Sequence, residues 1–231
     1  MDKVESTIHI TAIFNEERTE RYLLRKTWQA DGKSACIITI NPASKDVINL
    51  DLTTMLIQNS LNNLGYGSFD AVNISPKINP SSREIGRTAS IENLAQIKAS
   101  AEESQDVIIA WGSAGANNKK INERQLEILS LLKPFQDKVY MITDGKAKNL
   151  HPLVPTLRRN KWILEKFQFP ALKTEGQDKQ DSDKKKNSKK SRKQPVNENK
   201  EVGEEQNLAE MERGESEEDG TAEDSEISEI A

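Results

Sequence analysis

The chain has 231 residues and a formal net charge of −4, but its charges are distributed unevenly. Beyond Leu172 there is no aromatic residue, and charged and polar residues dominate. Residues 173–200 carry ten Lys and Arg against five Asp and Glu, and residues 201–231 carry one against thirteen. Such a segment buries too little apolar surface to offset its ordering entropy. We therefore expect a folded domain at residues 1–172, with a net charge of +3, and a disordered tail at residues 173–231 that is first basic and then acidic.

Composition also argues against several classes of protein. The only cysteine, Cys36, lies inside an apolar run, which excludes a disulfide framework and indicates a reducing compartment. The first residues are charged and no long apolar stretch follows them, which argues against a signal peptide. No window approaches the roughly 20 apolar residues of a membrane span. We expect a cytoplasmic protein that uses no membrane, metal or cofactor.

Five segments have the character of strands. Residues 6–14 are the first. The other four are continuous apolar runs, which are typical of strands buried on both faces of a parallel sheet. They lie at residues 34–40, 69–74, 106–111 and 138–143.

Helical patterns separate these runs. Apolar residues recur at helical spacing in residues 52–64, 88–104 and 121–133. A last helix is expected at residues 153–167, where Pro155 would start it and Trp162 and Phe167 would pack on the core. Strands that alternate with helices predict an α/β fold. We expect a three-layer sandwich around a central, mostly parallel four-stranded sheet.

In such sheets ligands bind at the carboxyl ends of the strands, so the loops that leave these ends are the places to search for a site. These loops lie at residues 41–44, 73–76, 111–113 and 144–152. Three of the four carry a polar residue beside a stiff or very small neighbour. The last one contains His151, one of only two histidines.

Motifs in the four loops, in this order, resemble those of the uracil-DNA glycosylase superfamily. TINPAS at residues 39–44 resembles its water-positioning motif, and AVNIS at residues 71–75 resembles the strand end whose Asn reads uracil. IIAWGSAGA at residues 108–116 resembles its Trp-Gly strand end, and HPLVP at residues 151–155 is similar to the loop with its catalytic His and wedge. Thr39 replaces the usual Gly of the first motif. No aromatic residue follows Asn41-Pro42, so the platform for base stacking either comes from elsewhere, with Tyr66 and Phe69 as candidates, or is missing.

The chain resembles a second family more closely, an uncharacterised bacterial family often carried on mobile elements. This match spans roughly residues 8–160. It includes an Arg-x-x-Leu…Trp lead at Arg21, Leu24 and Trp28, and an Asp-x-Thr at Asp51 and Thr53.

The resemblance to the glycosylases implies a hydrolase that flips uracil, or a related modified base, out of DNA and cleaves its N-glycosidic bond. Asn41 would position the attacking water, and His151 would donate as a neutral imidazole to the leaving base. An amide is neutral and cannot act as a strong base toward the water, as a carboxylate can. We therefore expect slower turnover than with Asp at position 41. The remaining roles are base recognition by Asn73, Pro42 and Ala43, support by Asp51, Thr53, Trp111 and Gly112, and a wedge at Leu153.

Each candidate also has a purely structural interpretation. Asn41 before Pro42 is a turn-starting dipeptide, and Asp51 is an N-cap of the next helix. His151 is then a loop histidine, Trp111 a wall of the core, and Leu153 the start of the last helix.

Basic residues near the predicted site are candidates for phosphate contacts, which give affinity without sequence choice. They are Arg83, Arg87, Lys119, Lys120, Lys146, Lys148, Arg158 and Arg159, with Lys161 beside the last two. We expect the protein to be a monomer that is encoded by a bacterium or a mobile element. Its expected partner is DNA, either single- or double-stranded. The tail would bind a protein partner or modulate the affinity for DNA.

Two other functions use the same residues. One is hydrolysis of free nucleosides or nucleotides, which needs neither a wedge nor a basic rim. The other is recognition of uracil-containing or single-stranded DNA without cleavage, consistent with Asn in place of Asp. Incubation with a uracil oligonucleotide followed by alkali separates these functions from DNA glycosylase activity.

Overall fold

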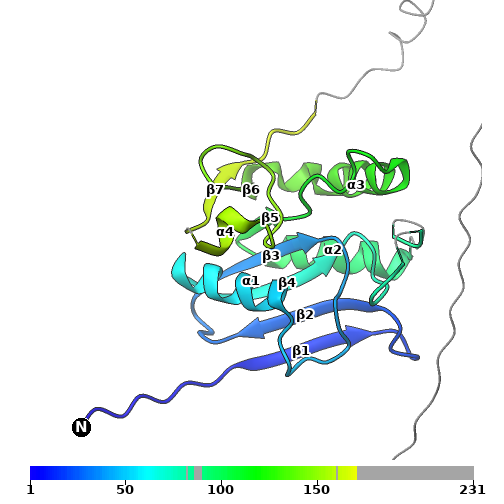
Figure 1. Ribbon diagram of the computed structural model, residues 1–231. Helices are drawn as coiled ribbons and strands as arrows, with labels where there is room; N and C mark the ends of the chain where they lie inside the picture. The colour runs from blue at the N-terminus through cyan, green and yellow to red at the C-terminus, as the bar shows by residue number, and fades with distance from the viewer. Residues whose placement is uncertain (82, 86–89, 160, 171–231) are drawn as a thin grey trace, which may run out of the picture. The chain divides into compact units, whose positions relative to one another are not determined.

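The computed structural model describes residues 1–81, 83–85, 90–159 and 161–170, which form an α/β fold around one mixed sheet (Figure 1). The sheet has seven strands in the order β1-β2-β4-β3-β5-β6-β7. Arg87, the predicted domain boundary at residue 172 and the predicted tail lie outside the described residues. Among the residues that are described, no helix has the length and apolar character needed to cross a membrane.

Four parallel strands form the centre of the sheet. They are β4 (Tyr66–Asn73), β3 (Lys33–Thr39), β5 (Asp106–Ile109) and β6 (Val139–Thr143). They correspond to the four continuous apolar runs of the sequence. Ile37 is paired with Ala71 on one side and Ile108 on the other, and all three are buried, as expected for strands covered on both faces.

The prediction of a four-stranded sheet is wrong, because antiparallel strands extend both edges. β1 (His9–Phe14) and β2 (Arg21–Thr27) lie beyond β4, and β7 (Ile163–Lys166) lies beyond β6. The sequence pattern does not reveal β2, because Arg and Lys occupy three of its seven positions.

A helix starts at Pro155 as predicted, but its predicted extent, residues 153–167, is wrong. Of the residues described in this segment, α4 (Pro155–Arg159) alone is helical, and β7 follows it. Trp162 packs in one hydrophobic core cluster and Phe167 against the other. These two side chains therefore contact opposite faces of the sheet, which one helical stripe could not achieve.

Two helical layers cover the sheet, as predicted (Figure 1). α1 (Leu52–Asn63) and α4 pack on one face through Ile57, Leu61 and Leu157. α2 (Ile91–Glu103) and α3 (Lys119–Leu132) pack on the other through Ile97 and Ile128, and the 3-10 helix η1 (Lys133–Lys138) follows α3. Asp51, Ser90 and Asn118 cap α1, α2 and α3 with side-chain oxygens, which fixes where these helices begin.

An ion-pair cluster explains part of the charge on β2. Arg25 donates from Nε and Nη2 to the two carboxylate oxygens of Asp70 on β4, at 2.6 and 2.7 Å. Its Nη2 also lies 2.7 Å from Glu103 Oε2 on α2. Asp70 is buried, so Arg25 neutralises a carboxylate that would otherwise be unpaired inside the protein.

We predict that Arg25→Met lowers the free energy of unfolding by about 2 kcal/mol. Removing one partner of a fully buried pair costs about 3–5 kcal/mol, and we reduce this value because Arg25 is partly exposed. Denaturant unfolding measures the change. The matched control is Glu103→Gln, which removes the exposed partner and should cost under about 1 kcal/mol. Equal stability of Arg25→Met and the unmodified protein would contradict this account of β2.

Candidate functional site

A cavity of about 260 Å³ lies where β3 ends, and we call it the strand-end cavity. Six residues singled out from the sequence line it: Asn41, Ala43, Asp51, Thr53, His151 and Leu153. Thr39 and Arg21 contribute further polar groups. Segments far apart in the sequence therefore meet in one hollow at the carboxyl ends of the parallel strands.

Asn41 is held in the loop that leaves β3. The backbone around it is anchored, since Ile40 O accepts from Ser75 N at 2.9 Å and Pro42 O accepts from Asn79 N at 3.1 Å. Asn41 Nδ2 donates to Pro42 O at 3.2 Å. This bond uses one of the two N–H groups of the amide and fixes which way the side chain is turned. The carbonyl oxygen Oδ1 is then the group of Asn41 that can accept a hydrogen bond from a ligand or a water.

His151 is a neutral imidazole of defined tautomer. Its Nδ1 accepts a hydrogen bond from Leu153 N at 3.2 Å, so the proton of the neutral ring lies on Nε2. Burial lowers the pKa of His151 below its ordinary value, because the imidazolium loses hydration. Val154 N donates to His151 O at 2.9 Å and closes the turn that carries the ring. The wall of the cavity therefore includes an uncharged imidazole with a free N–H.

Gly112 fixes the position of the His151 loop. Its φ is +62°, and a Cβ there would lie 3.1 Å from His151 Cβ and 3.3 Å from His151 N. Only glycine adopts this conformation readily and leaves room for the histidine backbone. Asn149 Nδ2 also donates to Gly112 O at 3.2 Å. Trp111 packs in the core cluster under α2 and α3, so it is a wall of the core, as its structural interpretation predicts.

Asp51 has the structural role of an N-cap and lines the cavity as well. Its Oδ1 accepts from Thr54 N at 3.0 Å and its Oδ2 accepts from Thr54 Oγ1 at 2.6 Å. These bonds hold the carboxylate at the start of α1, beside Thr53. The cavity thus contains a fixed negative charge.

Asn73 does not line the cavity. It lies beside Thr39 in the paired strands, is 1% exposed, and donates from Nδ2 to Thr39 Oγ1 at 2.6 Å. Its Oδ1 has no hydrogen-bond partner among the described residues. Asn73 therefore supports the wall through Thr39, and its role in reading a base stays a prediction.

Three other residues assigned to base binding are also absent from the cavity wall. Pro42 is buried in the loop after β3 and does not line the cavity. Tyr66 lies at the opposite end of β4, where its hydroxyl donates to Asp106 at 2.6 Å. Phe69 is buried against Trp28. Tyr66 and Phe69 as base-stacking residues are thus wrong, because both belong to the hydrophobic core.

Leu153 is half-buried on the cavity wall and precedes α4, so it does not begin that helix as its structural interpretation holds. Arg158 Nε donates to Leu153 O at 3.0 Å. This bond connects the cavity wall to a neighbouring basic surface.

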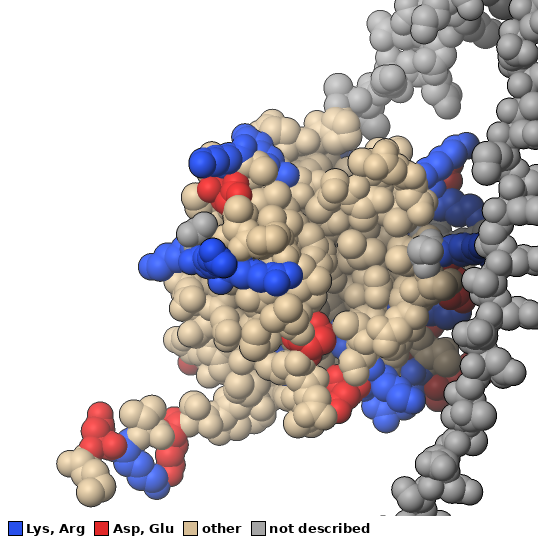
Figure 2. All heavy atoms as spheres, viewed as in Figure 1, with Lys and Arg blue, Asp and Glu red and all other residues tan. Residues whose placement is uncertain are grey.

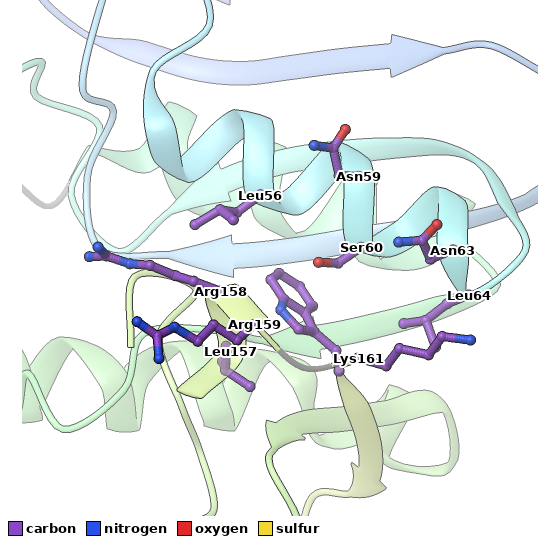
Figure 3. Close-up of a pocket in the computed structure, with 10 residues that line it drawn as sticks. Leu56, Asn59, Ser60, Asn63, Leu64, Leu157, Arg158, Arg159 and Lys161 are labelled. Atoms are coloured by element: carbon purple, nitrogen blue, oxygen red, sulfur yellow. The ribbon is translucent and has the colours of Figure 1, made fainter. Parts of the chain in front are cut away.

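The basic surface borders a second cavity, of about 250 Å³, which we call the α1–α4 groove (Figure 3). Figure 3 shows Arg158 and Arg159 on α4 beside α1, which carries Asn59, Ser60 and Asn63. Lys161 lines the groove as well. Figure 2 shows Lys and Arg atoms gathered over this side of the molecule.

The other residues predicted to contact phosphate are dispersed. Lys148 forms an ion pair with Glu165 at 2.7 Å, and Lys119 lies 3.7 Å from Glu123. Arg83, Lys120 and Lys146 are exposed but line neither cavity. Of the predicted residues that the structure describes, Arg158, Arg159 and Lys161 meet in one hollow.

Arg21 lines the cavity, although the sequence motif that contains it gave it no role in the site. It is buried at the start of β2, and Arg21 N donates to Pro76 O at 2.9 Å, which places it where β4 ends. The apolar pattern of the sequence does not predict β2 as a strand. It therefore does not place Arg21 at the edge of the sheet where the cavity lies. The Arg-x-x-Leu…Trp lead was the only available signal.

We predict that the imidazole of His151 titrates below about 6.5, the ordinary histidine pKa. Burial disfavours the protonated ring in the folded protein, and the unfolded chain binds the proton more readily. The resulting stability is present above about pH 6.5 and is lost as the pH falls through the pKa of folded His151. NMR titration of His9→Gln, which leaves His151 as the only histidine, measures this pKa. A midpoint at or above the ordinary value would refute the neutral imidazole.

One protein-family model matches the chain, that of the family described as "Protein of unknown function (DUF1643)", over residues 21–153. All residues that line the strand-end cavity lie within this match, which covers more than half of the chain. No curated protein and no solved structure matches the chain. The assignment to the uracil-DNA glycosylase superfamily is therefore wrong, since the family model that matches is a different one. The chain belongs to the DUF1643 family.

Proposed function

We propose that the strand-end cavity hydrolyses the N-glycosidic bond of uracil, or of a related modified base, in DNA. The observation that carries this proposal is the pairing of two polar groups in one cavity, the neutral His151 and the oriented amide of Asn41. The proposal rests on the chemistry of these groups and not on membership of a glycosylase family.

The reaction needs help at both ends of the bond that breaks. The electron pair of the bond leaves with the base, whose carbonyl oxygen gains negative charge, while the sugar carbon becomes positive. The Nε2–H of His151 can donate to that oxygen without itself losing a proton, and such donors act most strongly where water is excluded. A neutral imidazole suits this role, because it acts as a fixed dipole.

Water completes the reaction by adding to the sugar carbon, and the proton that it loses passes through solvent to the departed base anion. Asn41 Oδ1 would accept from that water and aim its lone pair at the sugar. The carboxylate of Asp51 lies on the same cavity wall, where its charge favours the positive sugar. Asp51 is thus assigned an electrostatic role, because its oxygens already accept from Thr54.

The size of the cavity suits a single nucleoside unit. Its volume of about 260 Å³ lies just below the roughly 300–1,000 Å³ of typical small-molecule sites. A base and its sugar fill such a space, whereas a stacked pair of bases does not. A base in DNA would therefore have to leave the helix to enter.

The α1–α4 groove supports DNA as the form of the substrate. Arg158, Arg159 and Lys161 line it, and none of them forms an ion pair with a carboxylate among the described residues. Arg158 also bonds to the backbone of Leu153, the proposed wedge on the cavity wall. A DNA backbone in the groove would thus pass beside the cavity.

Hydrolysis of a free nucleotide is the second candidate function. The buried Arg21 on the cavity wall favours it, because a guanidinium in that position suits an anionic group on the substrate.

We predict that Asn41→Ala and His151→Ala each lower uracil excision about 100- to 1,000-fold, the usual effect of removing one group that hydrogen-bonds in the transition state. DNA affinity should change little. Excision is measured by alkali cleavage of a uracil oligonucleotide, and the matched control is His9→Ala, an exposed histidine on the edge strand β1. If both variants cut as fast as the control, the reaction does not occur in this cavity. Retention of the oligonucleotide without cleavage by the unmodified protein would favour a binding function.

We predict that Arg159→Gln with Lys161→Gln weakens DNA binding in a salt-dependent way. The slope of log affinity against log salt should fall by about 1.4 for single strands and about 1.8 for duplex DNA, at roughly 0.7 and 0.9 per phosphate contact. Fluorescence anisotropy at several salt concentrations gives the slope. The control, Lys98→Gln with Lys133→Gln, removes two exposed charges elsewhere on the domain. An equal loss in both double variants would show that the groove is not a specific contact.

A further inference from the structure

Two buried cations lie on β2 next to the strand-end cavity. Arg21 is 3% exposed and Lys26 is 2% exposed. Arg21 lines the cavity, and its Nη1 donates to Ser44 O at 3.1 Å. Its Nε has no hydrogen-bond partner among the described residues. A buried guanidinium with an unused N–H is costly unless something binds there.

The two cations, Arg21 and Lys26, have no direct ion-pair partner among the described residues. Burial lowers the pKa of both, and Asp51 is the acidic group whose charge opposes that effect at each. Arg21 also lowers the pKa of Lys26 through repulsion. The lining of the cavity thus holds one cation, Arg21, and one anion, Asp51, and the buried Lys26 adds a second positive charge that repels Arg21.

Asp51 does not complete the site by itself. Both of its oxygens accept hydrogen bonds from Thr54, which hold it in place as the cap of α1. A uracil ring is uncharged and offers the Arg21 guanidinium only neutral acceptors. A phosphate ester offers charged oxygens to Arg21 and, from the same wall, to the Thr53 hydroxyl.

We propose that Arg21 binds a phosphate ester of the substrate inside the strand-end cavity. This inference rests on the proposed function and narrows its substrate to a nucleotide unit whose phosphate enters with the sugar. A free base or nucleoside is then a poor ligand. The phosphate is either the monoester of a free nucleotide or the diester next to the base in a DNA strand.

Calorimetric binding to the full-length chain tests the proposal without any need for catalysis. The first probes are 2′-fluoro-2′-deoxyuridine and its 5′-monophosphate, since the fluorine disfavours the positive sugar and protects the N-glycosidic bond. The second pair are oligonucleotides with one 2′-fluoro-deoxyuridine, with either a normal phosphodiester or a neutral methylphosphonate on its 5′ side. The first pair reports on a monoester and the second on a diester.

We expect the charged member of at least one pair to bind about 10- to 100-fold more tightly, the usual value of a charge-assisted hydrogen bond. Arg21→Gln should reduce this ratio to near one. The ratio compares two ligands on one protein, so a general loss of folded protein does not imitate the effect. A ratio near one for both pairs with the unmodified protein, or an unchanged ratio in Arg21→Gln, would overturn the proposal.

Asp51→Asn provides a second variant that keeps the fold. Asn caps helices as well as Asp does, but it removes the negative charge from the wall. The preference for the charged ligand should therefore increase in Asp51→Asn, and a decrease would overturn the proposal. If the preference depends on Arg21 while no uracil is released from unprotected DNA, the anion site stands and the proposed hydrolysis fails.

Discussion

The parallel pairing of β3 with β4 on one side and β5 on the other is the constraint on which the rest of the structure depends. This register brings the carboxyl ends of the central strands to one edge of the sheet, with Thr39 beside Asn73. The loops that leave this edge are anchored to neighbouring strand ends, as in the bond from Ser75 N to Ile40 O. The strand-end cavity therefore occupies a rigid frame, and its polar groups are positioned by backbone pairing and not by long flexible side chains.

Parallel strands and an antiparallel strand meet at this edge, and they contribute side chains of different chemistry. The loop after β6 carries a neutral histidine, which packs against Gly112 in the loop after β5. The antiparallel strand β2 begins where β4 ends and inserts a buried arginine. A neutral donor and a fixed cation thus line the same small space. The first suits a leaving base and the second suits a phosphate, so the proposed hydrolysis and the proposed anion site describe two parts of one substrate.

Much of this arrangement could be predicted from the sequence, because continuous apolar runs identify buried parallel strands, and their ends locate the loops. Of the antiparallel strands, β1 lies within the strand predicted at residues 6–14, whereas β2 and β7 could not be predicted in this way. Arg25 and Lys26 interrupt the apolar pattern of β2, and Arg25 is accommodated only through Asp70 on a strand distant in the sequence. The segment that forms α4 and β7 combines a helical pattern of apolar residues with a strand pattern, so neither element stands out. Without the register, the pattern also could not show that Thr39 engages the amide donor of Asn73.

The central claim is that a uracil nucleotide enters the strand-end cavity and meets Asn41 and His151. NMR spectroscopy of ¹⁵N-labelled protein tests this directly, with an oligonucleotide whose single uracil nucleotide carries the protective 2′-fluorine. The account predicts that the side-chain signals of Asn41 Nδ2 and His151 Nε2 shift on binding, and that an otherwise identical oligonucleotide with an abasic site shifts them much less. Binding of the uracil oligonucleotide with both signals unchanged would contradict the account.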